Sequence, residues 1–136
     1  MPPKEIFLSH SSKDKVKLLE IAETIRKHGL PVWYSEINIL GAQQWQDEIG
    51  SALKRCDWFI LLLSKESIKS IWVKRELSYA LSHNQYEEHI LPIILEDCNH
   101  DDLSWTISLF QMIDMKTIDA SSYTELLRTW GIGYNP

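Results

Sequence analysis

The chain has 136 residues, of which 44% are hydrophobic and 24% are charged, and its formal net charge is -5 at pH 7. This length fits one domain around one hydrophobic core and excludes two domains of ordinary size. The negative charge argues against a protein that binds the phosphate backbone of nucleic acids. Because no apolar run has the length of a membrane span or the pattern of a secretory signal, the composition predicts a cytoplasmic globular protein that does not enter a membrane.

The cysteines and histidines give no sign of a metal site. Cys56 and Cys98 form no CxxC pair, and the five histidines lack the spacing that is typical of metal ligands. We therefore expect neither a disulfide framework nor a bound metal. Cys56 stands just before an apolar run and is interpreted as a small buried residue.

The first quarter of the chain predicts a strand, a helix and a second strand. Residues 6–8 are apolar and lead into a serine-rich turn, where Ser11 and Asp14 have the spacing of a helix-capping box. A helix then extends to His28. Residues 31–34 form the second strand, which a right-handed crossover makes parallel to the first. The expected apolar face of the helix consists of Val16, Leu19, Ala22 and Ile25.

Residues 35–44 show no clear period and contain Gly41, so we expect an exposed loop of functional length. A second helix is predicted from Trp45 to about Arg55. Gly50 interrupts it, and a glycine inside a helix costs on the order of 1 kcal/mol relative to alanine. The glycine therefore indicates either close packing or a short helix.

Residues 58–64, WFILLLS, are the most continuous apolar run of the chain. They predict a strand that is buried on both faces, as in the middle of a parallel sheet covered by helices. Residues 67–81 follow as a helix. Its expected apolar stripe consists of Val73, Leu77, Ala80 and Leu81.

Residues 89–95 predict a fourth strand, in which Pro92 favours a strand start or an edge position over a central one. The patterns beyond it are weaker. The final residues, GIGYNP, resemble the start of a linker. A short helix, a fifth strand and an amphipathic helix are expected at 103–110, 111–115 and 123–130.

Alternating strands and helices in one small domain predict a doubly wound parallel sheet, in which ligands bind beyond the carboxyl ends of the strands. Glu76 lies one to two turns into the helix that follows the third strand. Trp72 lies four residues before it, so the indole and the carboxylate share one side of that helix. A glutamate on a helix is more often a solvated surface residue than a catalytic one, so this pair alone does not establish a site.

Four stretches of the chain resemble, in order, the motifs of a TIR (Toll/interleukin-1 receptor) domain of bacterial type. They read IFLSHSSKDK, VWYSE followed by INILGAQQWQDEIGSAL, DWFILLLSKESIKSIWVKREL, and HILPIIL. The resemblance implies a flavodoxin-like sheet of five parallel strands in the order 2-1-3-4-5. It also implies that residues 35–44 are the BB loop, the family's self-association element, and that residues 1–136 are a single TIR domain, either alone or as the N-terminal part of a longer multidomain protein.

The resemblance implies a catalytic role for Glu76. Many bacterial relatives cleave NAD+ at the bond between nicotinamide and ribose with a glutamate at this position, within WVKREL. NAD+ is then a substrate, and no cofactor is expected. A carboxylate can stabilise the oxocarbenium-like ribose, and because nicotinamide departs uncharged no general acid is needed. Trp72 can stack against the flat ring and attract the cationic pyridinium.

Five further positions match the motifs and are substrate-binding candidates. Phe7, His10 and Ser11 are expected to face the nucleotide, although Ser11 equally fits a role as helix N-cap. Trp33 is a candidate for which a core position is favoured, and Trp45 is equally open to a role as the first anchor of its helix.

Two functions remain open. The first is an NAD+ glycohydrolase that releases nicotinamide with ADP-ribose or a cyclic ADP-ribose, and that is activated by self-assembly into a homo-oligomer or filament in bacterial antiviral defence. The second is a non-catalytic module that assembles with other TIR domains as a signalling scaffold. The sequence leaves open the product, the acceptance of NADP and the activating partner.

Overall fold

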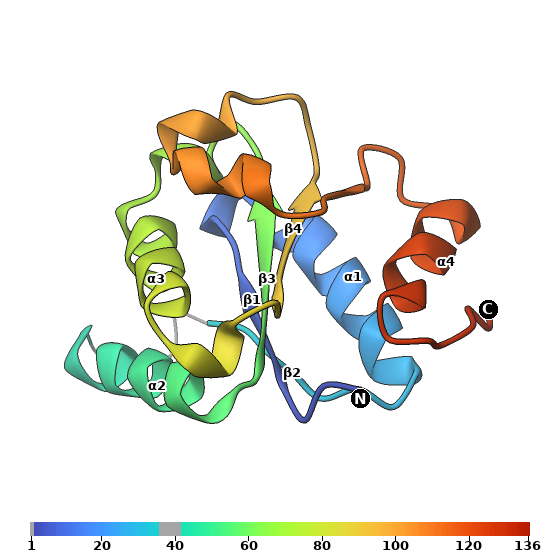
Figure 1. Ribbon diagram of the computed structural model, residues 1–136, viewed down its shortest axis with the longest axis horizontal. Helices are drawn as coiled ribbons and strands as arrows, with labels where there is room; N and C mark the ends of the chain where they lie inside the picture. Colours follow the sequence, from blue (N-terminus) through green and yellow to red (C-terminus); the bar gives the residue numbers. More distant parts are fainter. Residues whose placement is uncertain (1, 36–41) are drawn as a thin grey trace.

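The computed structural model describes residues 2–35 and 42–136, with side chains in the second range described from residue 46 onward. Five parallel strands form one sheet in the order β2-β1-β3-β4-β5 (Figure 1). This confirms the predicted doubly wound, flavodoxin-like fold. The strands are β1 (Ile6–Ser9), β2 (Val32–Trp33), β3 (Trp58–Leu63), β4 (Ile90–Ile94) and β5 (Ile113–Asp114).

Helices cover both faces of the sheet. The α-helices are α1 (Lys15–Lys27), α2 (Ala42–Arg55), α3 (Ile71–Leu81) and α4 (Ala120–Arg128). Helices α1 and α4 pack on one face and α2 and α3 on the other, and each pair encloses its own apolar cluster (Figure 1). Short 3-10 helices connect these elements, among them η1 (Ser12–Asp14) and η5 (Trp105–Leu109). None of the helices in the described residues combines the length and the apolarity that crossing a bilayer requires.

Strand β1 contributes to both clusters because successive side chains of a strand point to opposite faces. Ile6 and Leu8 belong to the cluster under α1 and α4, whereas Phe7 belongs to the cluster under α2 and α3. The same alternation directs Ser9, the last residue of the strand, toward α3. A polar side chain therefore faces α3 at the carboxyl end of a central strand.

The predicted apolar face of α1 is partly wrong. Val16 is 82% exposed and Leu19 is 38% exposed. The η1 turn precedes the helix, so α1 begins only at Lys15. From this start the helix turns Leu18, rather than the adjacent Leu19, toward the sheet. The buried face is Leu18, Ile21, Ala22 and Ile25. Leu81, at the last position of α3, is likewise more exposed than predicted.

Pro92 lies in the middle of an interior strand, which corrects the prediction of a strand start or an edge. Its Cα pairs with that of Leu61 in β3. The backbone N–H of Leu95 donates to the β3 carbonyl of Leu63, and the Ile94 carbonyl accepts from Met115 on the other side. Because successive residues of a strand direct their backbone N–H groups to opposite sides, the nitrogen of Pro92 faces the β5 side. Pairing with β5 begins only at Ile93. The missing N–H therefore costs no ladder hydrogen bond with β3.

Two residues of the predicted linker start at 131–136, Ile132 and Tyr134, pack against the apolar cluster under α1 and α4. The ring of Tyr134 lies 5.6 Å from His28 and 5.5 Å from Tyr123, centroid to centroid. The backbone N–H of Asn135 donates to Nε2 of His28 over 2.9 Å. These contacts place Tyr134, the aromatic residue of the tail, between the end of α1 and the start of α4.

Helix α2 begins at Ala42, three residues before the predicted start at Trp45. Residues 36–41, most of the predicted BB loop, lie outside the described part of the chain. Gly50 sits inside this 14-residue helix, and a Cβ atom built on it would meet no other atom within 4 Å. Neither close packing nor a short helix accounts for it.

The open space at Gly50 yields a stability prediction. Replacement Gly50→Ala should raise the free energy of unfolding by roughly 0.5–1 kcal/mol, because alanine restricts the unfolded chain and fits the helix without a clash. Urea denaturation monitored by circular dichroism measures the change. A midpoint at lower urea concentration in the variant would show that this position of α2 needs its glycine.

Candidate active site

A cavity of about 110 Å³ lies beyond the carboxyl end of β1, where the predicted ligand edge of the sheet is. Its walls come from the end of β1 and the turn after it, from the residue after Tyr34, and from the first turns of α3. The lining residues are Phe7, Leu8, His10, Ser11, Ser12, Ser35, Ser70, Trp72 and Glu76.

The start of α3 positions the two principal side chains. Ser70 is the N-cap, and its Oγ accepts a hydrogen bond from the Val73 N–H over 3.3 Å. From this cap the helix turns Trp72 and Glu76 to the cavity side. Trp72 is half-buried, and the Arg75 guanidinium lies 5.0 Å from the centroid of its ring, a cation–π contact.

Glu76 is buried, with only 5% of its surface exposed, so the interpretation of it as a solvated helix glutamate is wrong. The Ser9 hydroxyl donates a hydrogen bond to its Oε1 over 2.7 Å. Burial raises the pKa of Glu76 to about 7, and the Ser9 hydrogen bond opposes that shift. The carboxyl group is therefore divided between its neutral and ionised forms near pH 7.

His10 and Ser11 continue the wall of the cavity. Burial lowers the pKa of His10, so its imidazole is neutral at pH 7. Its ring lies edge-on to Tyr34, with 6.3 Å between centroids. The Ser11 Oγ accepts from the Lys13 N–H over 3.2 Å and caps η1. Ser11 is thus an N-cap that also lines the cavity, and its predicted contact with a nucleotide stays a prediction.

The remaining aromatic candidates differ in position. Phe7 lines the cavity and stacks on Phe59, with 5.5 Å between ring centroids. Trp33 is half-buried against Phe7, with 5.1 Å between ring centroids, and is not among the lining residues of the described cavity. The backbone of Trp45 lies in the first turn of α2, and its side chain is outside the described part of the structure.

The family model for the TIR domain matches residues 6–127. The chain belongs to the TIR domain family. Two curated relatives are similar to this chain in sequence. A 2′ cyclic ADP-D-ribose synthase from Acinetobacter baumannii is 28% identical over 118 residues, which are 85% of this chain and 44% of the relative. An NAD(+) hydrolase from Paracoccus denitrificans is 31% identical over 94 residues, 68% of this chain and 31% of the relative. The chain spans less than half the length of both.

Solved structures share the fold of this TIR domain. The TIR domain of the Toll-related receptor TRR-2 from Hydra magnipapillata superposes with a TM-score of 0.73 at 15% identity, covering 91% of this chain and 95% of that one. The TIR domains of the activated Roq1 resistosome superpose with a TM-score of 0.71 at 13% identity, covering 93% and 99%. At these identities the likeness extends to the fold alone.

Several polar residues in or behind the TIR domain's cavity are absent from the sequence-based candidates. Ser9, whose hydroxyl contacts the carboxyl group from behind the cavity, is the most important; its alternation with Phe7 along β1 indicates the face of the sheet on which it lies but not this contact. Ser12, Ser35 and Ser70 line the cavity itself. All three follow the predicted strands at the ligand edge, but an isolated serine in a loop carries no distinctive pattern.

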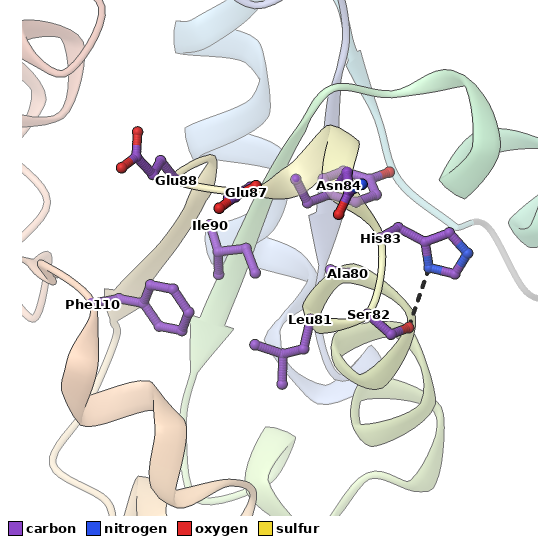
Figure 2. Close-up of a pocket in the computed structure, with 10 residues that line it drawn as sticks. Ala80, Leu81, Ser82, His83, Asn84, Glu87, Glu88, Ile90 and Phe110 are labelled. Atoms are coloured by element: carbon purple, nitrogen blue, oxygen red, sulfur yellow. Dashed lines mark hydrogen bonds between the residues drawn. The ribbon is translucent and has the colours of Figure 1, made fainter.

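A larger hollow, of about 360 Å³, lies at the other end of α3, beside the start of β4 (Figure 2). Leu81, Ile90 and Phe110 form its apolar part. Its carboxylates, Glu87 and Glu88, are exposed to solvent. The smaller cavity is therefore the candidate active site, because its carboxyl group is buried against apolar side chains. Among the described residues, no cluster of three or more histidine, cysteine or acidic side chains is arranged to hold a metal ion.

Proposed function

We propose that this TIR domain cleaves the bond between nicotinamide and ribose in NAD+, and that Glu76 is its catalytic carboxylate. One observation carries the proposal: a buried carboxyl group opens onto a cavity at the ligand edge of a doubly wound sheet. The names of the two relatives above, a cyclic ADP-D-ribose synthase and an NAD(+) hydrolase, support the choice of substrate.

The reaction needs one carboxylate. When the glycosidic bond breaks, its electron pair goes to the pyridinium nitrogen, which neutralises nicotinamide and leaves positive charge on the ribose. The ionised Glu76 stabilises that charge, and burial strengthens the attraction because the surroundings are weakly polarisable. Water then adds to the ribose and releases a proton to give ADP-ribose, or a hydroxyl of the same molecule adds to give a cyclic product.

Neighbouring side chains are suited to bind the substrate. Trp72 presents an indole beside Glu76, and its contact with Arg75 is of the kind that a cationic pyridinium ring would make. Phe7 supplies a second aromatic surface. The Ser11 hydroxyl and the neutral His10 ring can form hydrogen bonds with ribose or phosphate.

Assembly is part of the proposal because the cavity is small. Its volume of about 110 Å³ is well below the roughly 300–1,000 Å³ that is common for ligand pockets. We propose that a second copy, associating through the BB loop at 35–44 in a homo-oligomer or filament, supplies the remaining surface. We also propose that residues 1–136 form one domain. This domain acts in the cytoplasm, in bacterial antiviral defence.

The first experiment incubates concentrated protein with NAD+, alone and with a crowding agent or tethering to beads that forces assembly. Chromatography resolves nicotinamide, ADP-ribose and cyclic products. We expect nicotinamide release that is stronger in the assembled state, with the co-product distinguishing hydrolysis from cyclisation. No release even after assembly would contradict the proposal and favour the non-catalytic scaffold.

Activity should depend on pH through Glu76. Below its pKa of about 7 the carboxyl group becomes neutral, so kcat/KM should fall about tenfold for each pH unit below 7. The midpoint for kcat should lie lower, since bound pyridinium favours the ionised carboxylate. Replacement His10→Gln should retain the midpoint. Its disappearance in that variant would assign the titration to His10 instead.

A further inference from the structure

Ser9 and Glu76 form a buried pair between the sheet and α3. Ser9 is the last residue of β1 and only 1% exposed, and Glu76 is 5% exposed. The Ser9 Oγ donates to Oε1 of Glu76 over 2.7 Å, although the two residues are 67 positions apart in the chain. Glu76 lines the cavity and Ser9 does not, so the hydroxyl contacts the carboxyl group from the side away from the cavity.

We propose that Ser9 is a positioning residue for the proposed reaction: its hydroxyl holds Oε1 of Glu76, keeps the carboxylate ionised and leaves Oε2 to face the ribose. The inference rests on the proposed function and extends it to a residue behind the cavity. It assigns separate tasks to the two carboxylate oxygens, one to the protein and the other to the substrate.

The physical basis is the weakly polar surrounding of the pair. Phe7, Val73 and Leu77 belong to the same apolar cluster, and such surroundings disfavour a carboxylate. An ionised carboxylate accepts hydrogen bonds and cannot donate them, so a hydroxyl fixed as donor favours the ionised form. The backbone of a central strand and the capped first turns of α3 hold the two partners at this separation.

Ser9 is the principal polar partner of the Glu76 carboxyl group among the described residues. Burial and the Ser9 hydrogen bond are the two influences on the ionisation of Glu76. His10, which shares the cavity, is neutral at pH 7. Two other ionisable side chains on the elements packed around the pair are half-buried: Asp14, which accepts a hydrogen bond from Ser64, and Tyr79. The remaining ones are exposed to solvent, and they are Lys13, Asp47, Glu48, Lys54, Arg55, Lys74 and Arg75.

The test follows Glu76 directly, without substrate. The carboxyl resonance of Glu76 in ¹³C NMR spectra is assigned by its absence from Glu76→Gln, and its midpoint is measured in the wild type and in Ser9→Ala. We expect the midpoint to move upward by about one pH unit or more, the shift that loss of a hydrogen bond to a charged group produces. Ser9→Cys, which keeps the size and a weak donor, should give a smaller upward shift.

Ser64 offers a matched control. It follows β3 as Ser9 ends β1, it is 1% exposed, and its hydroxyl donates to Oδ2 of Asp14 over 2.5 Å. Ser64→Ala removes a buried hydroxyl of the same kind and should leave the Glu76 midpoint in place. Equal midpoints in the wild type and Ser9→Ala, or equal shifts in Ser9→Ala and Ser64→Ala, would overturn the positioning role.

Kinetics separate this inference from the proposed function. The deficit of Ser9→Ala in kcat/KM should be small at pH 9 and grow as the pH falls toward 6, whereas a purely structural defect would be similar at both pH values. If Glu76→Gln abolishes turnover but Ser9→Ala leaves the midpoint unchanged, the NAD+ reaction stands and the role of Ser9 falls. If no turnover is found in any variant, the NMR titration still decides whether Ser9 controls the carboxyl group.

Discussion

Glu76→Gln is expected to reduce the rate of nicotinamide release by at least about 10²–10³-fold, the range that follows loss of a single group that stabilises transition-state charge. The amide has nearly the same shape as the carboxyl group and can still bond to Ser9, so the geometry of the cavity is kept while the negative charge is lost. Release of nicotinamide by assembled protein, followed by chromatography at pH 8, measures the change.

A second glutamate provides the control for this experiment. Glu87, at the hollow beyond the far end of α3, is exposed to solvent, and Glu87→Gln removes the same charge from the chain (Figure 2). This control should retain full turnover. Turnover by Glu76→Gln at the level of the control would exclude the carboxylate mechanism, whatever product is formed.

Glu76→Gln should also make the protein more stable at alkaline pH. The pKa of Glu76 is about 7 in the folded chain and 4.5 for the free group. Between these values the unfolded chain ionises more readily, so ionisation opposes folding as the pH rises. The penalty is absent below about pH 4.5, grows through the interval and levels off above pH 7, at about 3 kcal/mol. Glutamine, which does not ionise, escapes it.

Urea denaturation at a series of pH values tests this expectation. The stability of Glu76→Gln relative to the wild type should rise between pH 4.5 and pH 7 and then remain constant, with little difference at pH 4. Other groups titrate in both proteins, so the difference between them isolates Glu76. Glu125→Gln, at an exposed position of α4, should show no such rise. A flat difference for Glu76→Gln would mean that the carboxyl group ionises in the folded state as easily as in water.

The sequence predicts the architecture because the fold depends on patterns that are local in the chain. The apolar run at 58–64 is strand β3, the serine-rich turn after β1 starts η1 and α1, and the weak pattern at 111–115 contains β5. The predicted apolar face of α1 is wrong because Leu18 and Leu19 are adjacent and both apolar, so the sequence pattern allows two different apolar faces. The η1 turn, which selects between them, is a detail of backbone geometry.

The contacts of the site depend on positions that are distant in the chain. The sequence places Trp72 and Glu76 on one side of a helix, but the burial of Glu76 follows from the way α3 packs over the end of β1. Its raised pKa is a consequence of that packing. For the same reason the Ser9 contact is not predictable from local pattern, since a strand must end opposite the second turn of a helix that begins some sixty residues later.

The division of the apolar interior into two clusters has a consequence for engineering. The buried carboxyl group and its serine partner lie on the side of the sheet that α2 and α3 cover, whereas the cluster beneath α1 and α4 is separated from them by the strands. Substitutions beneath α4, for example at Leu126 or Leu127, are expected to change the stability of that half of the interior while leaving the Ser9–Glu76 hydrogen bond in place. A more stable variant would therefore be sought first in that half of the molecule.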